Sequence, residues 1–168
     1  MLKSIVKSSF EAAGFKISRL PNRRDVPPSP SVHHKVELIF DVGANTGQYA
    51  KKTRSEGYRG KIVSFEPSPD AHAALVENAK SDPLWVVHKR AAVGSEPGEA
   101  EINISRNSES SSILPMLEAH SSAAPASAYV GKARTEVITL DSVFDDYRGR
   151  NERTLLKIDT QGFEDKVL

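Results

Sequence analysis

The residues best suited to chemistry form a glycine-containing turn, DVGANTG, at positions 41–47. The turn lies between an apolar run typical of a buried strand and a helical pattern. Gly43 permits a tight turn and close approach of a ligand to the backbone. The unpaired N–H groups of a first helical turn suit a carboxylate, and Asp41 can accept a hydrogen bond from an ammonium group or an ordered water. Together these groups suit the amino-acid end of a nucleoside ligand.

Glu66, at the end of the next apolar run, is the second candidate ligand-binding residue. A carboxylate there can accept hydrogen bonds from ribose hydroxyls, but this placement also occurs in dinucleotide enzymes, about 20 residues after the glycine turn. The glycine-containing turn at 41–47 discriminates better than Glu66 between NAD and other nucleoside ligands. Asn45 stands where the G-x-G-x-x-G fingerprint has its second glycine, and Asp41 places a negative charge near the position of a pyrophosphate. Both features disfavour NAD.

Alternating strand and helix patterns would position these residues at one edge of a sheet. Apolar runs predict buried strands over residues 36–43, 61–67 and 84–89, and helical patterns occupy residues 46–56 and the stretch after Ser68, which can cap its helix. This order indicates an α/β fold with a parallel sheet and right-handed crossovers. Such sheets bind ligands beyond the carboxyl ends of their strands.

The pattern changes after the third strand. Residues 91–105 predict a strand end, a turn at 96–98 and an antiparallel strand. Residues 106–134 are rich in Ser and Ala with little periodicity, which is typical of an active-site lid or a disordered segment. Strands are expected at 135–140 and 154–160, with Asp141 capping a short helix through Tyr147 between them. A further helix begins within 161–168.

Taken in order, these segments resemble the FkbM-type methyltransferase family. The resemblance covers about residues 36–168 and rests on IFDVGANTGQYA, SFEPSP, the asparagine of LVENAK, AAVGSEPGEAEI, the serine cluster SESSSIL, VITLDSV and LLKIDTQGFEDKVL. The run ending in KIDTQGFE is more specific than DVGANTG, which fits many methyltransferases. The resemblance implies a Rossmann-like class I methyltransferase sheet, mostly parallel with an antiparallel hairpin. It also implies S-adenosylmethionine as cofactor and, usually, O-methylation of a sugar, glycolipid or natural-product hydroxyl.

The resemblance also implies roles for individual residues. Glu66 would hold the ribose, and Asp159 would face the methyl-transfer site, as the base or to orient the acceptor. Capping the following helix is the alternative for Asp159. Pro67, Ala91 and Ala92 would lie around the adenine. The residues expected around the methionine part are Asp41, Gly43, Ala44, Asn45 and Gly47.

Two departures from the family pattern bear on these expectations. The family more often has glutamate where Gln161 stands, so any role of that glutamate in the family is not expected of this chain. The sequence ends at Leu168, whereas a sheet of this type has seven strands, three of which should follow. We therefore expect that the C-terminal strands are missing, and two explanations stay open: the sequence is truncated, or another chain supplies the cover. Exposed edge strands favour association, which is consistent with a homo-oligomer.

Other polar residues are weaker candidates. We expect His88 to be a satisfied sheet residue, His120 a solvated loop residue, and His33 and His34 to have no catalytic part. The serines at 108–112 could bind substrate, although such loops are usually only polar. Asp159 and Glu164 are too few for a metal site, so no metal is expected.

Composition and charge limit the remaining possibilities. The 168 residues fit one domain over residues 35–168, after a basic helix and Pro-rich linker at 1–34. Residues 1–35 carry seven basic and two acidic side chains, yet the net charge of +1 gives no reason to expect nucleic acid. There is no cysteine, no signal-peptide pattern and no apolar run long enough to cross a bilayer, so the cytoplasm is the default location.

Three functions stay open on these grounds. The first is methyl transfer to a small-molecule, glycan or glycolipid acceptor. The second is a non-catalytic, nucleoside-binding or interaction domain, and the third, less favoured, is an NAD-dependent oxidoreductase. The amphipathic pattern at residues 2–13 predicts a helix that docks on protein or makes peripheral contact with a membrane.

Overall fold

The computed structural model describes residues 29–105, 129–150 and 152–168. The expected N-terminal helix, the Pro-rich linker before residue 29, the serines at 108–112 and His120 lie outside these residues. Along the chain the elements are α2 (Pro30–His33), β1 (Leu38–Val42), α3 (Gln48–Ser55), β2 (Lys61–Phe65), α4 (Pro69–Ala79), β3 (Trp85–Val87), β4 (Ala91–Val93), β5 (Gly98–Ser105), β6 (Tyr129–Ile138), α6 (Asp141–Tyr147), β7 (Thr154–Ile158) and α7 (Glu164–Val167).

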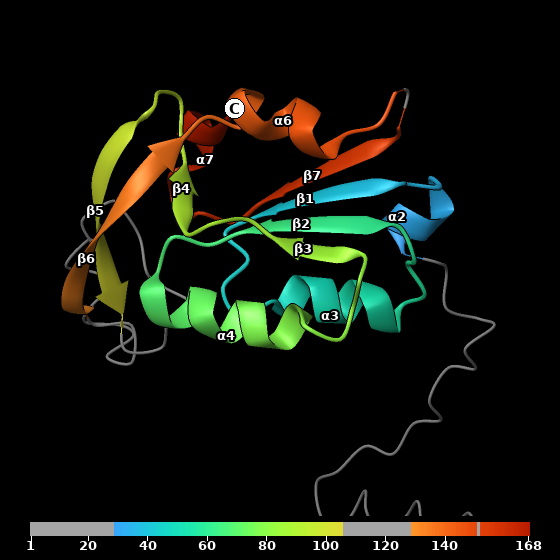
Figure 1. Cartoon of the computed structure of the whole chain (residues 1–168), viewed down its shortest axis with the longest axis horizontal. Helices are drawn as coiled ribbons and strands as arrows, with labels where there is room; N and C mark the ends of the chain where they lie inside the picture. Colours follow the sequence, from blue (N-terminus) through green and yellow to red (C-terminus); the bar gives the residue numbers. More distant parts are fainter. Residues whose placement is uncertain (1–28, 106–128, 151) are drawn as a thin grey trace, which may run out of the picture.

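The main sheet has four parallel strands in the order β3-β2-β1-β7 (Figure 1). β1 lies in the middle, where Leu38 is in register with Lys61 of β2 and with Thr154 of β7. All five residues of β1 are buried, as expected of a strand covered on both faces. The predicted α/β class with a parallel, Rossmann-like main sheet is therefore confirmed.

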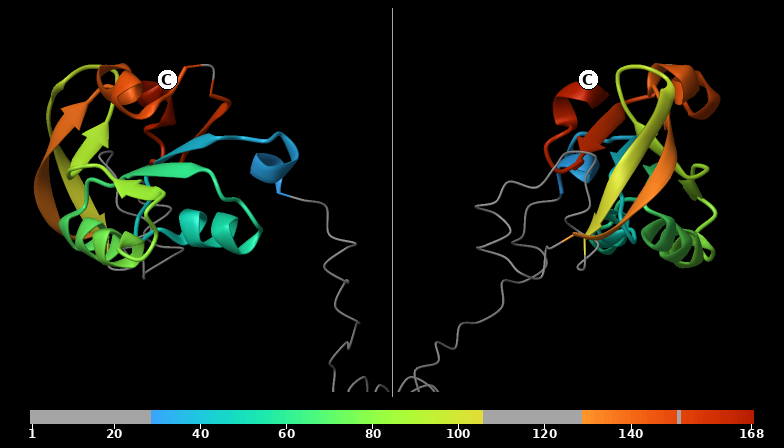
Figure 2. Two further views of the ribbon diagram at one scale, coloured as in Figure 1. Left: turned by 45° about the vertical axis from the view of Figure 1, so that its right-hand side comes forward. Right: turned by 90° about the vertical axis from the view of Figure 1, so that its left-hand side faces the viewer.

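Side chains of β1 alternate between two cores. Ile39 packs in the cluster with Ala50 of α3 and Leu75 of α4, whereas Phe40 packs in the cluster that includes Phe144 of α6. The views from two sides show α3 and α4 on one face of the sheet and α6 on the other (Figure 2). The Phe40 ring stacks on Phe144 at a centroid distance of 5.2 Å. The domain is thus a three-layer structure, and its buried central strand explains the continuous apolar run in the sequence.

The second sheet contains β4, β6 and β5 in that order. The turn expected at residues 96–98 does separate two strands, but β4 and β5 do not pair with each other, because β6 lies between them. β4 pairs with β6 in parallel and β5 pairs with it antiparallel. The antiparallel pair is therefore formed by strands on either side of residues 106–128.

β6 also corrects the expected boundary of the irregular segment, which was placed at residue 134. The strand already begins at Tyr129. Exposed Lys132, Arg134 and Glu136 alternate with the less exposed Ala133 and Thr135, which is the period of a half-buried strand. The charged residues of this strand hid its alternation from an interpretation based on apolar runs.

Two expected helix caps differ in detail. Ser68 takes the N-cap position of α4, but its hydroxyl makes no capping hydrogen bond, and its backbone N–H donates to the Glu66 carboxylate instead. Asp141 does not cap α6 and lies inside its first turn. Thr139 takes that part, since its Oγ1 accepts a hydrogen bond from the Ser142 N–H at 3.2 Å.

Candidate active site

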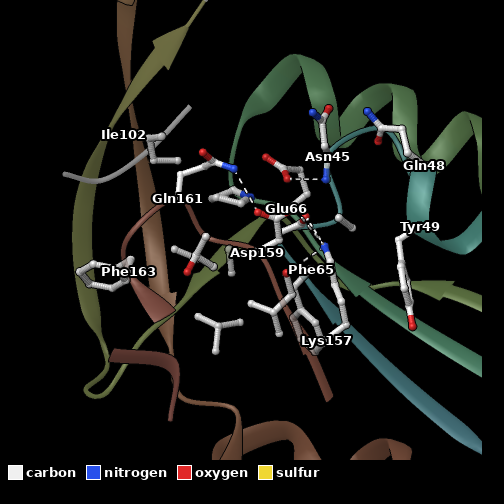
Figure 3. Close-up of a pocket in the computed structure, with 18 residues that line it drawn as sticks. Asn45, Gln48, Tyr49, Phe65, Glu66, Ile102, Lys157, Asp159, Gln161 and Phe163 are labelled. Atoms are coloured by element: carbon white, nitrogen blue, oxygen red, sulfur yellow. Dashed lines mark hydrogen bonds and ion pairs between the residues drawn. The ribbon is translucent and has the colours of Figure 1, made fainter. Parts of the chain in front are cut away.

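A cavity of about 410 Å³ opens where β1, β2 and β7 end. Its wall is made by the turns after these three strands, by β4 and by Ile102 of β5 (Figure 3). Eight of the ten residues predicted for the site line it: Gly43, Ala44, Asn45, Glu66, Pro67, Ala91, Ala92 and Asp159. Parallel strands thus bring together residues that are far apart in the sequence, at the edge where open α/β sheets bind ligands.

The turn after β1 is fixed to β2 by its backbone. The N–H groups of Gly43 and Ala44 both donate to the carbonyl oxygen of Phe65, at 3.0 Å each. Gly43 has a φ of +72°, a conformation that glycine adopts at little cost. Its Cα also faces the backbone carbonyl of Asp159 so closely that any Cβ would overlap that oxygen. Glycine at position 43 is therefore required twice, by conformation and by space.

Glu66 is held rigidly in the cavity wall. Its side chain is buried, with an exposed fraction of 7%. Oε2 accepts a hydrogen bond from the Asn45 N–H at 2.8 Å, and Oε1 accepts one from the Ser68 N–H at 2.9 Å. Burial raises the pKa of Glu66, and these two hydrogen bonds oppose the shift. Each oxygen has further lone-pair capacity, so the carboxylate is oriented and can still accept hydrogen bonds from a ligand.

Asp41 is not on the cavity wall. Its side chain is fully buried, and its Oδ1 pairs with Lys157 Nζ at 2.9 Å. Burial raises the pKa of Asp41, and the Lys157 ammonium opposes this shift. The ammonium group that the sequence led us to expect from a ligand is thus supplied by the chain itself. With its charge compensated, Asp41 no longer argues against a pyrophosphate.

Gly47 is also absent from the cavity lining. It is the N-cap residue of α3, with a φ of +88°, and a Cβ at this position would lie 2.5 Å from the indole ring of Trp85 and 3.0 Å from Leu75. Gly47 therefore allows α3 to pack closely on the sheet. Its place in the motif reflects packing between a helix and a strand rather than contact with the cavity.

Lys157 is a residue of the site that the sequence interpretation missed. It lies on β7, in register with Asp41 of β1, and lines the cavity. Its Nζ donates to the Gly43 carbonyl at 2.9 Å. A lysine inside the apolar run TLLKID was the available signal, because charges are rarely buried in a strand without a partner.

Asp159 faces the cavity from the turn after β7. Its carboxylate is half-exposed, with Oδ2 3.9 Å from Lys157 Nζ, and its Oδ1 accepts a hydrogen bond from Gln161 Nε2 at 3.0 Å. Gln161 therefore supplies a donor to Asp159 where a glutamate would bring a second negative charge. Figure 3 shows Asp159 near the centre of the view, between Gln161 and Lys157.

The turn after Asp159 is closed by Glu164. The Glu164 carboxylate accepts hydrogen bonds from the N–H groups of Thr160 at 2.9 Å and Gly162 at 3.0 Å, and α7 has no side-chain cap. Asp159 is thus not the cap of this helix, and the Glu164 oxygens are directed at the backbone. Within residues 29–105, 129–150 and 152–168, no three His, Cys, Asp or Glu side chains come together as a metal site would need.

His88 lies outside the cavity, in the aromatic core beneath it. Its Nδ1 is hydrogen-bonded to the Tyr147 hydroxyl at 2.7 Å, and its ring is 5.0 Å from that of Phe65. Burial lowers the pKa of His88, and the nearby charge of Lys89 acts in the same direction. His88 directly follows β3 and donates its backbone N–H to Ser64, but among the described residues its buried Nε2 has no hydrogen-bond partner, so the expectation of a fully satisfied histidine is wrong in that respect. His33 and His34 are exposed on α2 and its end, which precedes β1 and so lies at the opposite end of that strand from the cavity (Figure 1).

Comparison with known families agrees with this geometry. The model of the methyltransferase FkbM domain matches residues 41–168, from the buried aspartate of β1 to the end of α7. The chain belongs to the FkbM methyltransferase family. No curated protein and no solved structure gives a significant match.

Membership in the FkbM family relates the cavity to methyl transfer, because the family match includes the residues that line it. The matched residues contain every element that lines the cavity, from the turn after β1 to the turn after β7, and methyltransferases of this family generally use S-adenosylmethionine. Among the described residues of this FkbM domain, no helix has the length and apolarity needed to span a bilayer.

Proposed function

We propose that this methyltransferase binds S-adenosylmethionine in the cavity and methylates a hydroxyl of a sugar, a glycolipid or a natural product. The observation that carries the proposal is the anchored carboxylate of Glu66 beside the turn after β1. Glu66 would accept hydrogen bonds from the ribose hydroxyls, and Gly43, Ala44 and Asn45 would surround the amino-acid end. Pro67, with the buried Ala91 and Ala92 of β4, would flank the adenine.

The cavity suits this cofactor in both polarity and charge. One part of its lining is apolar and includes Phe65, Val93, Ile102 and Phe163, as an adenine ring requires. The carboxylates of Glu66 and Asp159 face the cavity, whereas the charge of Asp41 is balanced by Lys157. The resulting negative field favours a sulfonium cation over a pyrophosphate. The NAD alternative is therefore disfavoured by Glu66, Asp159 and Asn45 rather than by Asp41.

The cofactor supplies an activated methyl group, so the chain has to align the acceptor oxygen, exclude water and receive a proton. Asp159 is our candidate for the last step, because its carboxylate is at the cavity and half-exposed. The Gln161 amide orients it through Oδ1, and Oδ2, which lies 3.9 Å from the Lys157 ammonium, would accept the proton of the acceptor hydroxyl. A base positioned in this way typically contributes about 10²–10⁴-fold to the rate.

Calorimetric titration of the purified chain with S-adenosylhomocysteine tests the binding part of the proposal. We expect saturable binding by the wild type, weakened binding by Glu66→Ala, and no binding of NAD at the same concentration. If the wild-type chain is folded and binds NAD but not S-adenosylhomocysteine, the proposal is wrong.

The catalytic part needs transfer of a labelled methyl group from S-adenosylmethionine to a panel of monosaccharides, glycolipids and polyketide alcohols. Asp159→Asn should keep the affinity for S-adenosylhomocysteine and lose most of the transfer. Tight binding without transfer to any member of the panel would favour the non-catalytic, nucleoside-binding alternative.

A further inference from the structure

We propose that Lys157 is a positioning residue of the donor site, and that its ammonium group holds the turn after β1 in the shape that receives the amino-acid end of the donor. This inference rests on the proposed function. Lys157 of β7 is in register with Asp41 of β1, which is in register with Ser64 of β2. The three residues form a polar row across adjacent strands, and Tyr49 of α3 lies over Lys157, with 5.7 Å between Nζ and the ring centroid.

Most polar contacts of the ammonium group are with β1 and the turn that follows it, and Asp159 Oδ2 lies 3.9 Å away. Its Nζ lies 2.9 Å from Asp41 Oδ1 and donates to the carbonyl oxygens of Gly43 at 2.9 Å and Val42 at 3.4 Å. The side chain of Lys157 is only 18% exposed, although it lines the cavity. The largely buried ammonium group of Lys157 therefore contacts the backbone of the turn after β1.

These contacts complete a clamp around the turn. On the side of β2, Phe65 accepts hydrogen bonds from the N–H groups of Gly43 and Ala44, and Glu66 accepts one from that of Asn45. On the side of β7, Lys157 holds the Gly43 carbonyl. The peptide groups of the turn therefore form hydrogen bonds with residues of both neighbouring strands. Removal of Lys157 would eliminate those on the β7 side.

Lys157 also compensates the negative charge of the buried Asp41 carboxylate. Asp41 has an exposed fraction of 0%, and a buried carboxylate that loses its cation is strongly destabilised. Without Lys157, Asp41 would have to take up a proton or draw water beneath the turn. Either change would move the Gly43 peptide, which lies between Asp41 and the cavity. We therefore expect loss of Lys157 to lower the stability of the domain and, in addition, to change the shape of the donor site.

The test compares Lys157→Met with Lys61→Met. Both lysines lie on main-sheet strands and donate to backbone carbonyls, but Lys61 donates to Tyr147, at 3.0 Å, and does not line the cavity. In the ligand-free proteins, amide hydrogen exchange of Gly43, Ala44 and Asn45 should accelerate about ten-fold in Lys157→Met, the equivalent of losing one charged hydrogen bond, and stay unchanged in Lys61→Met. Unchanged exchange in Lys157→Met would overturn the inference.

If Lys157→Met does not fold, the same measurements are made on Lys157→Gln.

Two ligands then separate local positioning from general damage. S-adenosylhomocysteine carries the amino-acid end, and methylthioadenosine lacks it. Lys157→Met should weaken binding of S-adenosylhomocysteine by at least about ten-fold and leave binding of methylthioadenosine within about two-fold. An equal loss for both ligands would contradict a role at the amino-acid end. If the wild type binds neither ligand, the proposed function fails, while the exchange rates still decide the structural part for Lys157.

Discussion

Gly43 and the backbone carbonyl of Asp159 are in contact across β1 and β7, with no room for a side chain at position 43. The contact joins the turn of the proposed donor site directly to the candidate base. It also prevents either turn from shifting toward the other.

Gly43→Ala should therefore destabilise the domain strongly. The left-handed φ of +72° alone costs an alanine roughly 1–2 kcal/mol, and overlap with the Asp159 carbonyl adds to this. We expect a loss of more than about 3 kcal/mol in the free energy of unfolding, measured by urea denaturation.

Gly57→Ala is the matched control. Gly57 has a φ of +101°, but nothing lies within 4 Å of the position its Cβ would take. It should therefore show the cost of the conformation alone. Equal losses of unfolding free energy in the two variants would mean that overlap with the Asp159 carbonyl does not contribute to the destabilisation.

The second prediction concerns Glu66 and pH. Burial raises the pKa of this carboxyl above its ordinary value of 4.5, and only the ionised form presents all its lone pairs to ribose hydroxyls. Affinity for S-adenosylhomocysteine should therefore be full at high pH and should fall as the pH decreases through that raised pKa. Calorimetry between pH 8 and pH 5 measures the decline.

Glu66→Gln should bind about 10- to 100-fold more weakly at pH 8, since its amide NH₂ replaces one of the two carboxylate oxygens and cannot accept the backbone hydrogen bond made there. It should also lose the part of the pH dependence that belongs to Glu66. A pH profile unchanged by this substitution would assign the effect to another buried acid, such as Asp41.

The third prediction is a pH dependence of stability that comes from His88. Burial lowers the pKa of His88 below its ordinary value of 6.5, so the imidazole is neutral in the folded chain. Once the pH falls below that ordinary value, the unfolded chain binds a proton that the native chain does not. Stability is then lost progressively down to the lowered pKa, at up to about 1.4 kcal/mol per pH unit.

Denaturation curves at pH 7.5, 6.5 and 5.5 would show this slope. His88→Asn keeps a hydrogen-bond acceptor for Tyr147 and should flatten it, whatever the variant's stability at pH 7.5. His33→Asn, on the exposed surface of α2, should leave the slope as in the wild type. A slope that survives His88→Asn would disprove this assignment.

Local patterns were sufficient to predict the first half of the main sheet. The helical pattern over residues 46–56 and its stop at Gly57 placed α3 within one or two residues of its observed bounds, because glycine commonly ends a helix. Glu66 could be predicted at the cavity, since the ends of neighbouring parallel strands share one edge of a sheet.

Contacts between distant segments could not be predicted in this way. The residue types in β4 do not show that it pairs with β6, whose matching residues follow 45 positions later. Asp41 was interpreted as a ligand contact because its partner, Lys157, lies in a strand that comes much later in the chain. Sequence spacing indicates that a buried carboxylate needs a cation, but it does not say whether the cation belongs to a ligand or to the chain.

The clamp formed by Lys157 has a consequence for how the chain matures. Lys157 and Gly43 are 114 residues apart, so a ribosome that adds about 5–20 residues per second makes Lys157 roughly 6–23 s after Gly43. During that interval Asp41 has no cation from β7, and burial of β1 between its neighbours is unfavourable. We therefore expect β1 to stay accessible to chaperones and to other emerging chains until β7 has been synthesised, and the donor site to take its final shape only after Lys157 has been added.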